Sequence, residues 1–175
     1  MWWNAQCRKS SQGCEIDPGL ATVHDSRSKL PCEQRSGQEM KPTKACPVLV
    51  RGTGLEASIL AFEHPHAGLQ LVKGTIEPGE SAGQAAVREL KEEAGVGGIV
   101  VRDLGLWRSG RKHHIWSFHL CQTQTFLPET WSHYCLDDGG HAFRFFWQPL
   151  ASPLSNTWHP IHVAAVEFVR CALLQ

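Results

Sequence analysis

Three glutamates share one face of a predicted helix in the middle of the chain, and a fourth precedes that helix. The helix is expected from Ser81 to Ala94, with successive residues turned by about 100°. Glu89, Glu92 and Glu93 therefore stand at i, i+3 and i+4, whereas Glu80 comes just before the helix. Like charges at these spacings repel by roughly a few tenths of a kcal/mol, and a purely solvated face would usually include basic partners.

Convergent carboxylates make a good site for hard divalent cations, which prefer oxygen ligands. Mg²⁺ or Mn²⁺ is therefore the expected ligand of this acidic face. The alternative is an ordinary solvated face, and acid clustering alone favours that alternative because glutamate-rich helices are common. Of the basic residues, Lys91 points away from the acids, and Arg88 lies next to Glu92 and could contact only part of the cluster.

The elements around the cluster must hold the helix against a core. Ser81 is a plausible N-cap, and Gly95 ends the helix. The side away from the acids can pack on a sheet and consists of Gly83, Ala86, Val87, Leu90 and Ala94.

Strands and a second helix are expected on both sides of this segment. Strand-like patterns cover residues 45–51, 55–62, 69–73, 96–106, 114–123 and 142–147, with a turn at 64–68. Helical spacing returns near the end of the chain at Ile161, Ala164, Ala165, Phe168 and Cys171. Helices interleaved with an excess of strands indicate an α/β or α+β fold rather than a helix bundle.

Length and charge limit the possible functions. A chain of 175 residues suits one catalytic domain, expected at residues 40–175. Its 17 basic and 17 acidic residues balance, which argues against binding to duplex nucleic acid. No stretch approaches the roughly 20 apolar residues of a membrane span, and the first residues lack a signal-peptide pattern, so we expect a cytoplasmic protein. The oligomeric state is not indicated.

Residues 1–39 have few aliphatic side chains and no sustained period, which predicts a poorly ordered extension. An irregular cap on the domain is the alternative. The seven cysteines include no C-x-x-C pair and are interpreted as free thiols. A zinc site from Cys7, Cys14 and Cys32 with a histidine is a further alternative, although their spacing fits no usual ligand pattern.

Spacing decides between the metal site and the solvated face. From Gly74 the chain reads GTIEPGE, then seven residues, then RELKEEAGV ending at Val96. This resembles the Nudix box, G-x₅-E-x₇-R-E-U-x-E-E-x-G-U with U aliphatic, at every specified position. The resemblance favours the metal site.

The resemblance implies a mixed β-sheet sandwiched between helices, and an enzyme that hydrolyses nucleoside diphosphates linked to another moiety. Ions would be bound by the Gly74 carbonyl and by Glu89, Glu92 and Glu93, with Glu80 in the outer part of the site. Glu89 would also activate water, and Arg88 would hold Glu89 through a salt bridge. Divalent cations would lower the barrier by coordinating phosphate oxygens and lowering the pKa of bound water, and a carboxylate would accept the proton.

Five residues outside the box are further candidates for contact with substrate. Lys73, directly before the box, could reach a phosphate, and His113 and His114 could approach the base or phosphate end. Members of the family often add an acidic group from a loop beyond the helix, for which Asp137 and Asp138 are the candidates. Each also has a plain interpretation as a surface, strand or turn residue.

The substrate within the family is less clearly indicated. The proline and tyrosine that often follow the box in ADP-ribose and dinucleoside polyphosphate hydrolases are absent, since the first such residues are Pro128 and Tyr134. The segment from Leu71 to Glu80 looks like that of dinucleoside polyphosphate and nucleoside triphosphate hydrolases, which are ranked first. The alternatives are a Nudix-like module that senses a nucleotide without cleaving it, although such modules usually have a damaged box, and a structural scaffold.

Overall fold

The computed structural model describes residues 40–110, 114–136 and 140–174. The predicted extension at residues 1–39 and three candidate site residues, His113, Asp137 and Asp138, lie outside these ranges. The domain boundary at Met40 therefore stays a prediction.

A mixed sheet of eight strands has the order β5-β6-β1-β2-β8-β7, with β3 beside β2 and β4 beside β1. Strand β1 pairs with β6 in parallel, and the other pairings are antiparallel. The strands are β1 (Lys44–Arg51), β2 (Ser58–His64), β3 (Gly68–Gln70), β4 (Gly74–Thr75), β5 (Ile99–Arg108), β6 (Ile115–Gln122), β7 (Thr130–Cys135) and β8 (His141–Pro149).

The sheet divides along β1. The first six residues of β1 pair with β6, whereas only Val50 and Arg51 pair with β2. One half of the sheet thus contains β4, β1, β6 and β5, and the other contains β3, β2, β8 and β7. The chain passes from one half to the other between Gln70 and Gly74, directly before the acidic segment.

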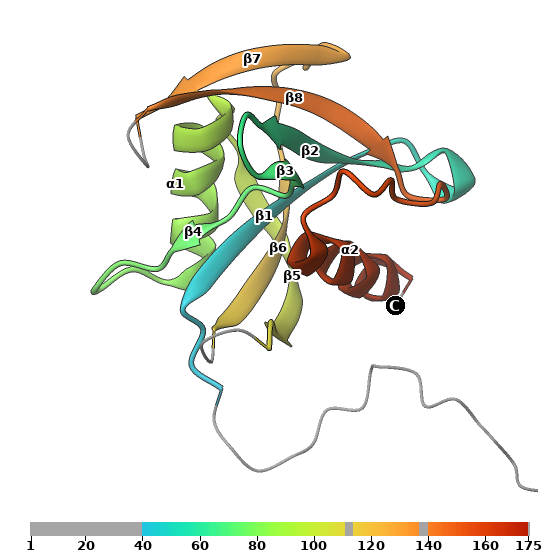
Figure 1. Ribbon diagram of the computed structural model, residues 1–175. Coiled ribbons are helices and arrows are strands. Elements are labelled where there is room, and N and C mark those ends of the chain that lie inside the picture. The colour runs from blue at the N-terminus through green and yellow to red at the C-terminus, as the bar shows by residue number, and fades with distance from the viewer. Residues whose placement is uncertain (1–39, 111–113, 137–139, 175) are drawn as a thin grey trace, which may run out of the picture. The chain divides into compact units, whose positions relative to one another are not determined.

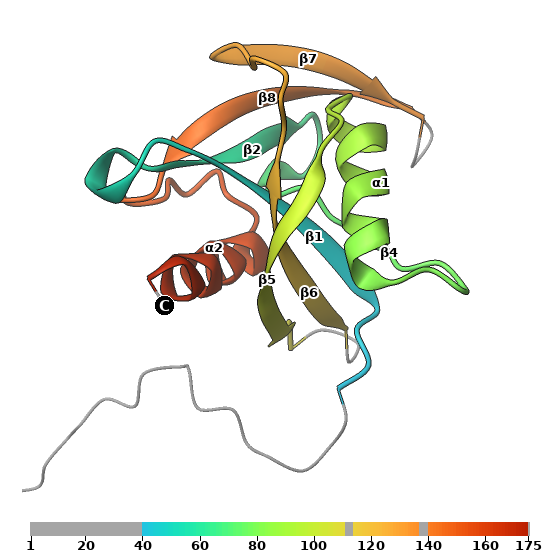
Figure 2. The same ribbon diagram turned by 180° about the vertical axis from the view of Figure 1, so that it is seen from behind.

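One helix covers each face of the sheet, α1 (Ala82–Ala94) on one side and α2 (Pro160–Leu173) on the other (Figures 1 and 2). Leu90 and Ala94 of α1 pack with Phe62 and Phe145 in one buried cluster. The second cluster joins three residues of α2 to the strands, and its members include Ala165, Val166, Val169, Ile59, Trp116 and Phe118. The predicted sandwich of a mixed sheet between helices is confirmed.

Helix α1 begins and ends where the sequence predicts. The Ser81 side chain accepts a hydrogen bond from the Gln84 backbone, and the Gln84 side chain accepts one from the Ser81 backbone, which completes a capping box. Gly95 ends the helix with φ 72°, a left-handed conformation that glycine adopts without strain. Of the predicted packing side, Ala86, Leu90 and Ala94 are buried, and Gly83 and Val87 are half-buried; Ala85 and Glu89 are buried as well.

The prediction for the closing helix was right about its existence and wrong about its buried face. The buried residues of α2 are His162, Ala165, Val166 and Val169, whereas the expected Ala164 and Cys171 are exposed. Apolar residues occur almost all round this helix, so their spacing marks no single face. A histidine was not expected inside, because burial of a polar ring requires a hydrogen-bond partner that the local sequence does not show.

Two strand predictions also differ from the structure. The residues before Ser58 form a short 3₁₀ turn at Gly54–Glu56 rather than a strand, and Leu55 is exposed. The strand expected at residues 69–73 ends at Gln70. Strands β4 and β7 were not predicted. Within the residues described, no helix has the length and apolar character required to span a membrane.

Candidate active site

The glycine that opens the acidic segment lies directly against a carboxylate of α1. Gly74 is buried in β4, opposite Ala45 of β1. A Cβ atom at Gly74 would overlap the carboxylate of Glu89, which is itself only 4% exposed. The φ angle of Gly74 lies outside the left-handed region, so space rather than backbone conformation requires the glycine. The buried carboxylate and the main chain of β4 are thus in contact.

Arg88 joins the loop before α1 to the acidic face of the helix. Its guanidinium binds both oxygens of Glu80, with Nε to Oε1 and Nη2 to Oε2 each 3.0 Å. Nη1 donates to Glu89 Oε1 at 2.8 Å and to Glu92 Oε2 at 2.7 Å, and Nη2 donates to the Thr75 carbonyl at 2.8 Å. These five hydrogen bonds match the five N–H donors of an arginine. We call this set the Arg88 clamp.

The clamp changes the acid–base properties of its members in opposite directions. Hydrogen bonds from Arg88 hold the pKa of Glu80 below its usual value. The pKa of Arg88 is raised further above its already high value, first by its hydrogen bonds to Glu80 and then by those to Glu92 and Glu89. Both groups therefore stay ionised at neutral pH. The sequence suggested that Arg88 contacts only part of the cluster, and it contacts Glu80, Glu89 and Glu92 but not Glu93.

Glu93 is bound from a different direction. Its Oε2 accepts a hydrogen bond from the backbone nitrogen of Lys73 at 3.4 Å. The Lys73 ammonium lies 5.9 Å from the centre of the Trp116 ring, in a cation–π contact. The structure thus brings the main chain of Lys73 to the acidic cluster.

His114, the one predicted histidine that is described, lies just before β6. Its carbonyl accepts hydrogen bonds from the Ser109 backbone and side chain, at 3.1 and 3.0 Å. These contacts involve its main chain and hold the ends of β5 and β6 together. They give no role to the imidazole.

Three contacts at the site were not predicted from the sequence. The Thr75 carbonyl binds Arg88, and the Thr75 hydroxyl accepts a hydrogen bond from Lys44 Nζ at 2.7 Å. His133 of β7 bonds through Nε2 to the Glu92 carbonyl at 3.0 Å. Lys44 and Thr75 are opposite each other in the β1–β4 ladder, so only the strand pairing could have revealed their contact.

The side chains of the box are of the kind that hard divalent cations prefer, because they are glutamate carboxylates, and Gly74 leaves room for the carboxylate of Glu89. Among the described residues, no three carboxylate, histidine or cysteine side chains already converge in an arrangement that could hold an ion. Three of the glutamates instead bind Arg88. A cation at Glu89 and Glu92 would therefore compete with Nη1 of Arg88.

The chain is similar to known proteins in sequence pattern and in fold. The model of the NUDIX domain matches residues 41–167. No curated protein matches the sequence significantly. Among solved structures, an ADP-ribose pyrophosphatase from Streptococcus suis is similar with a TM-score of 0.52 and 19% identity, over 77% of this chain and 92% of that one.

Two further solved structures extend the comparison. A UDP-X diphosphatase has a TM-score of 0.58 and 14% identity, over 82% of this chain and 66% of that one. NrtR from Shewanella oneidensis, crystallised with a 27mer DNA, has a TM-score of 0.51 and 20% identity, over 75% of this chain and 61% of that one. At these identities the structures share the fold, and the family model, which matches most of the chain, shows that the chain belongs to the NUDIX family.

Proposed function

We propose that the chain is a divalent-metal-dependent pyrophosphohydrolase that cleaves the phosphoanhydride linkage of nucleoside diphosphate derivatives. The observation that carries the proposal is the buried Glu89 carboxylate, which contacts the main chain at Gly74 and is bound by Arg88. Burial of a carboxylate is costly unless it is paired and hydrogen-bonded, so its retention beneath an acidic face indicates chemistry.

The residues of the chain have distinct parts in this reaction. The Gly74 carbonyl with Glu89, Glu92 and Glu93 would hold the ions, and Glu80 would lie in the outer part of the site. Bound Mg²⁺ or Mn²⁺ supplies positive charge for the pyrophosphate oxygens and makes water more acidic. Glu89 accepts the proton of the attacking water. Arg88 orients Glu89 and ties it to the loop through Glu80.

The names of two structural neighbours support the substrate class. Both an ADP-ribose pyrophosphatase and a UDP-X diphosphatase are named for nucleoside diphosphate derivatives. Within this class we propose dinucleoside polyphosphates or nucleoside triphosphates, on the resemblance of residues 71–80 to the segment of such hydrolases.

One neighbour favours a second candidate function. NrtR was crystallised with DNA, so proteins of this fold include at least one that contacts a nucleic acid. A module that binds a nucleotide without cleaving it is the alternative. The balance of 17 basic and 17 acidic residues gives no general attraction to duplex DNA, and every specified box position is present.

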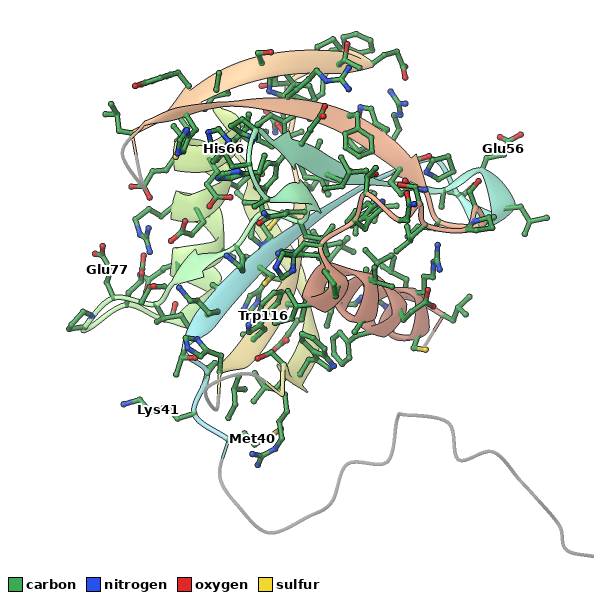
Figure 3. All side chains as sticks on the ribbon, in the orientation of Figure 1. Met40, Lys41, Glu56, His66, Glu77 and Trp116 are labelled. Carbon is green, nitrogen blue, oxygen red and sulfur yellow. The ribbon has the colours of Figure 1, made fainter. Side chains whose placement is uncertain are left out.

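The deciding experiment measures phosphate release from a panel of nucleotides with Mg²⁺, with Mn²⁺ and with excess chelator. The parent should act only with metal, and its rate should rise towards alkaline pH as a proton is lost from the attacking water. Glu89→Gln should lower kcat by roughly 100- to 10,000-fold. The matched control is Glu56→Gln, an exposed glutamate far from the box loop marked by Glu77 (Figure 3).

The outcomes separate the two candidates. Nucleotide binding without release by the parent would favour the sensing module. Undiminished turnover in excess chelator would remove the metal from the mechanism. Equal losses of kcat in Glu89→Gln and Glu56→Gln would show that Glu89 is not the group that accepts the proton of water.

We also propose that the catalytic domain begins at Met40, since the box and the matched residues 41–167 lie after that point. A protein starting at Met40 should fold and keep the turnover of the whole chain. Loss of turnover with the box intact would show that residues 1–39 belong to the working domain.

A further inference from the structure

The three residues directly before the box have no partner strand in the sheet. Strand β3 ends at Gln70, which pairs with Phe62, and β4 begins at Gly74, which pairs with Ala45. Between them, Leu71 and Val72 are 2% and 1% exposed. Buried backbone N–H groups need hydrogen-bond partners, so these residues must find partners outside the ladders. We call residues 71–73 the crossing.

A buried histidine of α2 supplies the first partner. His162 is 1% exposed, and its Nδ1 accepts a hydrogen bond from the Leu71 backbone nitrogen at 3.0 Å. Burial lowers the pKa of His162 to about 3, and the charges of Lys73 and His159 act in the same direction. The imidazole is therefore neutral, with its proton on Nε2, because Nδ1 serves as the acceptor.

The opposite helix supplies a second partner. At the other end of the crossing, the Lys73 backbone nitrogen donates to Glu93 of α1 at 3.4 Å. The crossing is thus held by one side chain from each helix, His162 from α2 and Glu93 from α1. The next residue is Gly74, whose position decides whether the main chain meets the Glu89 carboxylate.

The segment before α2 binds the chain just ahead of the crossing. Leu69 donates its N–H to the Thr157 carbonyl at 3.0 Å, and its own carbonyl accepts from the His159 N–H at 3.1 Å. Together with His162, these bonds connect α2 and its preceding segment to residues 69 and 71. The other face of the sheet therefore contributes to the placement of the box loop.

We propose that His162 is a positioning residue for the hydrolysis: its bond to the Leu71 N–H fixes the crossing and thereby places Gly74 against Glu89. This inference rests on the proposed function. His162 lies outside the box, on the helix at the opposite face of the sheet from α1. It acts through the main chain and does not touch the reacting atoms.

Two substitutions separate the hydrogen bond from the volume of the ring. His162→Asn keeps an acceptor at the same number of bonds from Cβ, because Oδ1 takes the place of Nδ1. His162→Leu keeps apolar volume and removes the acceptor. We expect His162→Leu to lower kcat by roughly 10- to 100-fold, the size that a displacement of about 1 Å can cause, with little change in KM. His162→Asn should stay within roughly threefold of the parent.

A control is needed for plain loss of stability. Val169→Ala removes buried volume from the same helix, at a residue that is 0% exposed and belongs to the same cluster as Leu71. It should lower the melting temperature and leave kcat unchanged at a temperature where the protein is folded. If His162→Leu does not fold, His162→Gln takes its place, since its acceptor lies one bond farther from Cβ.

The second readout needs no turnover. Hydrogen exchange at the Leu71 amide should be faster in His162→Leu than in the parent and in Val169→Ala, and close to the parent in His162→Asn. Unchanged exchange at Leu71, or an equal loss of kcat in Val169→Ala, would overturn the inference. A parent that hydrolyses nothing would overturn the proposed function and the catalytic part of this inference, whereas the exchange measurement would still report whether His162 holds the Leu71 N–H.

Discussion

The two helices each bury a polar side chain, and they do so for different purposes. In α1, Glu89 forms an ion pair with Arg88, whose own partners include two further glutamates. In α2, His162 is neutral and accepts one backbone hydrogen bond. The first arrangement places carboxylates where we propose that a cation binds, and the second binds the main chain at Leu71. Burial alone does not distinguish a chemical group from a positioning group; the state of charge and the partner do.

The largest effect should come from filling the space between Gly74 and the carboxylate of Glu89. Gly74→Ala places a methyl group where the Glu89 carboxylate lies, so either β4 or the carboxylate must move. We expect kcat to fall by roughly 100-fold or more, and the free energy of unfolding to fall by about 1 to 3 kcal/mol, as for other overpacked sites. Initial rates and urea titrations measure the two.

Gly97→Ala is the matched control. Gly97 is exposed, its φ is not left-handed, and a Cβ there would meet no atom within 4 Å. Both measurements should stay close to the parent. Comparable losses in Gly97→Ala and Gly74→Ala would mean that glycine flexibility, rather than the space beside Glu89, is what the site needs.

The next largest effect should come from weakening the Arg88 clamp. Arg88→Lys keeps the charge and loses the planar fork that binds Glu80, Glu89 and Glu92 together. We expect kcat to fall by roughly 10- to 100-fold because Glu89 is no longer oriented. The same change at Arg144, which pairs with Glu63 on the surface, should cost about 0 to 1 kcal/mol and leave kcat unchanged. Parent-like turnover in Arg88→Lys would show that charge suffices and that orientation does not matter.

The buried, neutral His162 should make the stability of the protein depend on pH. Burial lowers the pKa of His162 from its ordinary value of 6.5 to about 3 in the folded protein. As the pH falls below about 6.5, His162 binds a proton in the unfolded chain but not in the folded protein. The free energy of unfolding therefore decreases as the pH is lowered. Each pH unit is worth about 1.4 kcal/mol, which gives about 2 kcal/mol at pH 5.

His162→Asn removes this titration and keeps the acceptor. Urea titrations at pH 7 and pH 5 should therefore show a smaller loss in the variant than in the parent. Burial also lowers the pKa of His119. Its contribution has the same sign in both proteins and cancels in the comparison. Identical losses in parent and variant would mean that His162 is protonated in the folded protein.

The acidic face of α1 could be predicted from the sequence better than the contact between His162 and Leu71, for a physical reason. The acids of α1, its Ser81 cap and its Gly95 end are related by spacings of three and four residues, which a helix converts directly into contacts. The contact between His162 and Leu71 spans 91 positions, and nothing local marks either residue. For the same reason, the Lys44–Thr75 contact and strand β4 could not be predicted before the pairing of β1 was known.

The smallest expected effect is on the metal-free stability of Glu92→Gln. Glu92 is 46% exposed and accepts from Arg88 at 2.7 Å, an i, i+4 pair of the kind worth about 0.3 to 0.5 kcal/mol on a surface. Its repulsion from Glu89 is of similar size, and glutamine keeps both an acceptor and the helix propensity. The two changes therefore nearly cancel, and the metal-free melting temperature should stay within about 1 to 2 °C of the parent, since about 1 kcal/mol shifts it by roughly 2 to 4 °C in a chain of this size.

Metal should then separate the two proteins. A ligand that binds the folded state stabilises it by mass action, so Mg²⁺ should raise the melting temperature of the parent more than that of Glu92→Gln, which lacks one charged ligand. Glu56→Gln should respond to Mg²⁺ as the parent does, because Glu56 lies far from the box. If Glu92→Gln melts far below the parent without metal, and Mg²⁺ leaves the parent's melting unchanged, Glu92 is a structural partner of Arg88. The acidic face would then need another explanation, because removing a pure ligand costs binding of the cation and leaves the metal-free fold almost as it was.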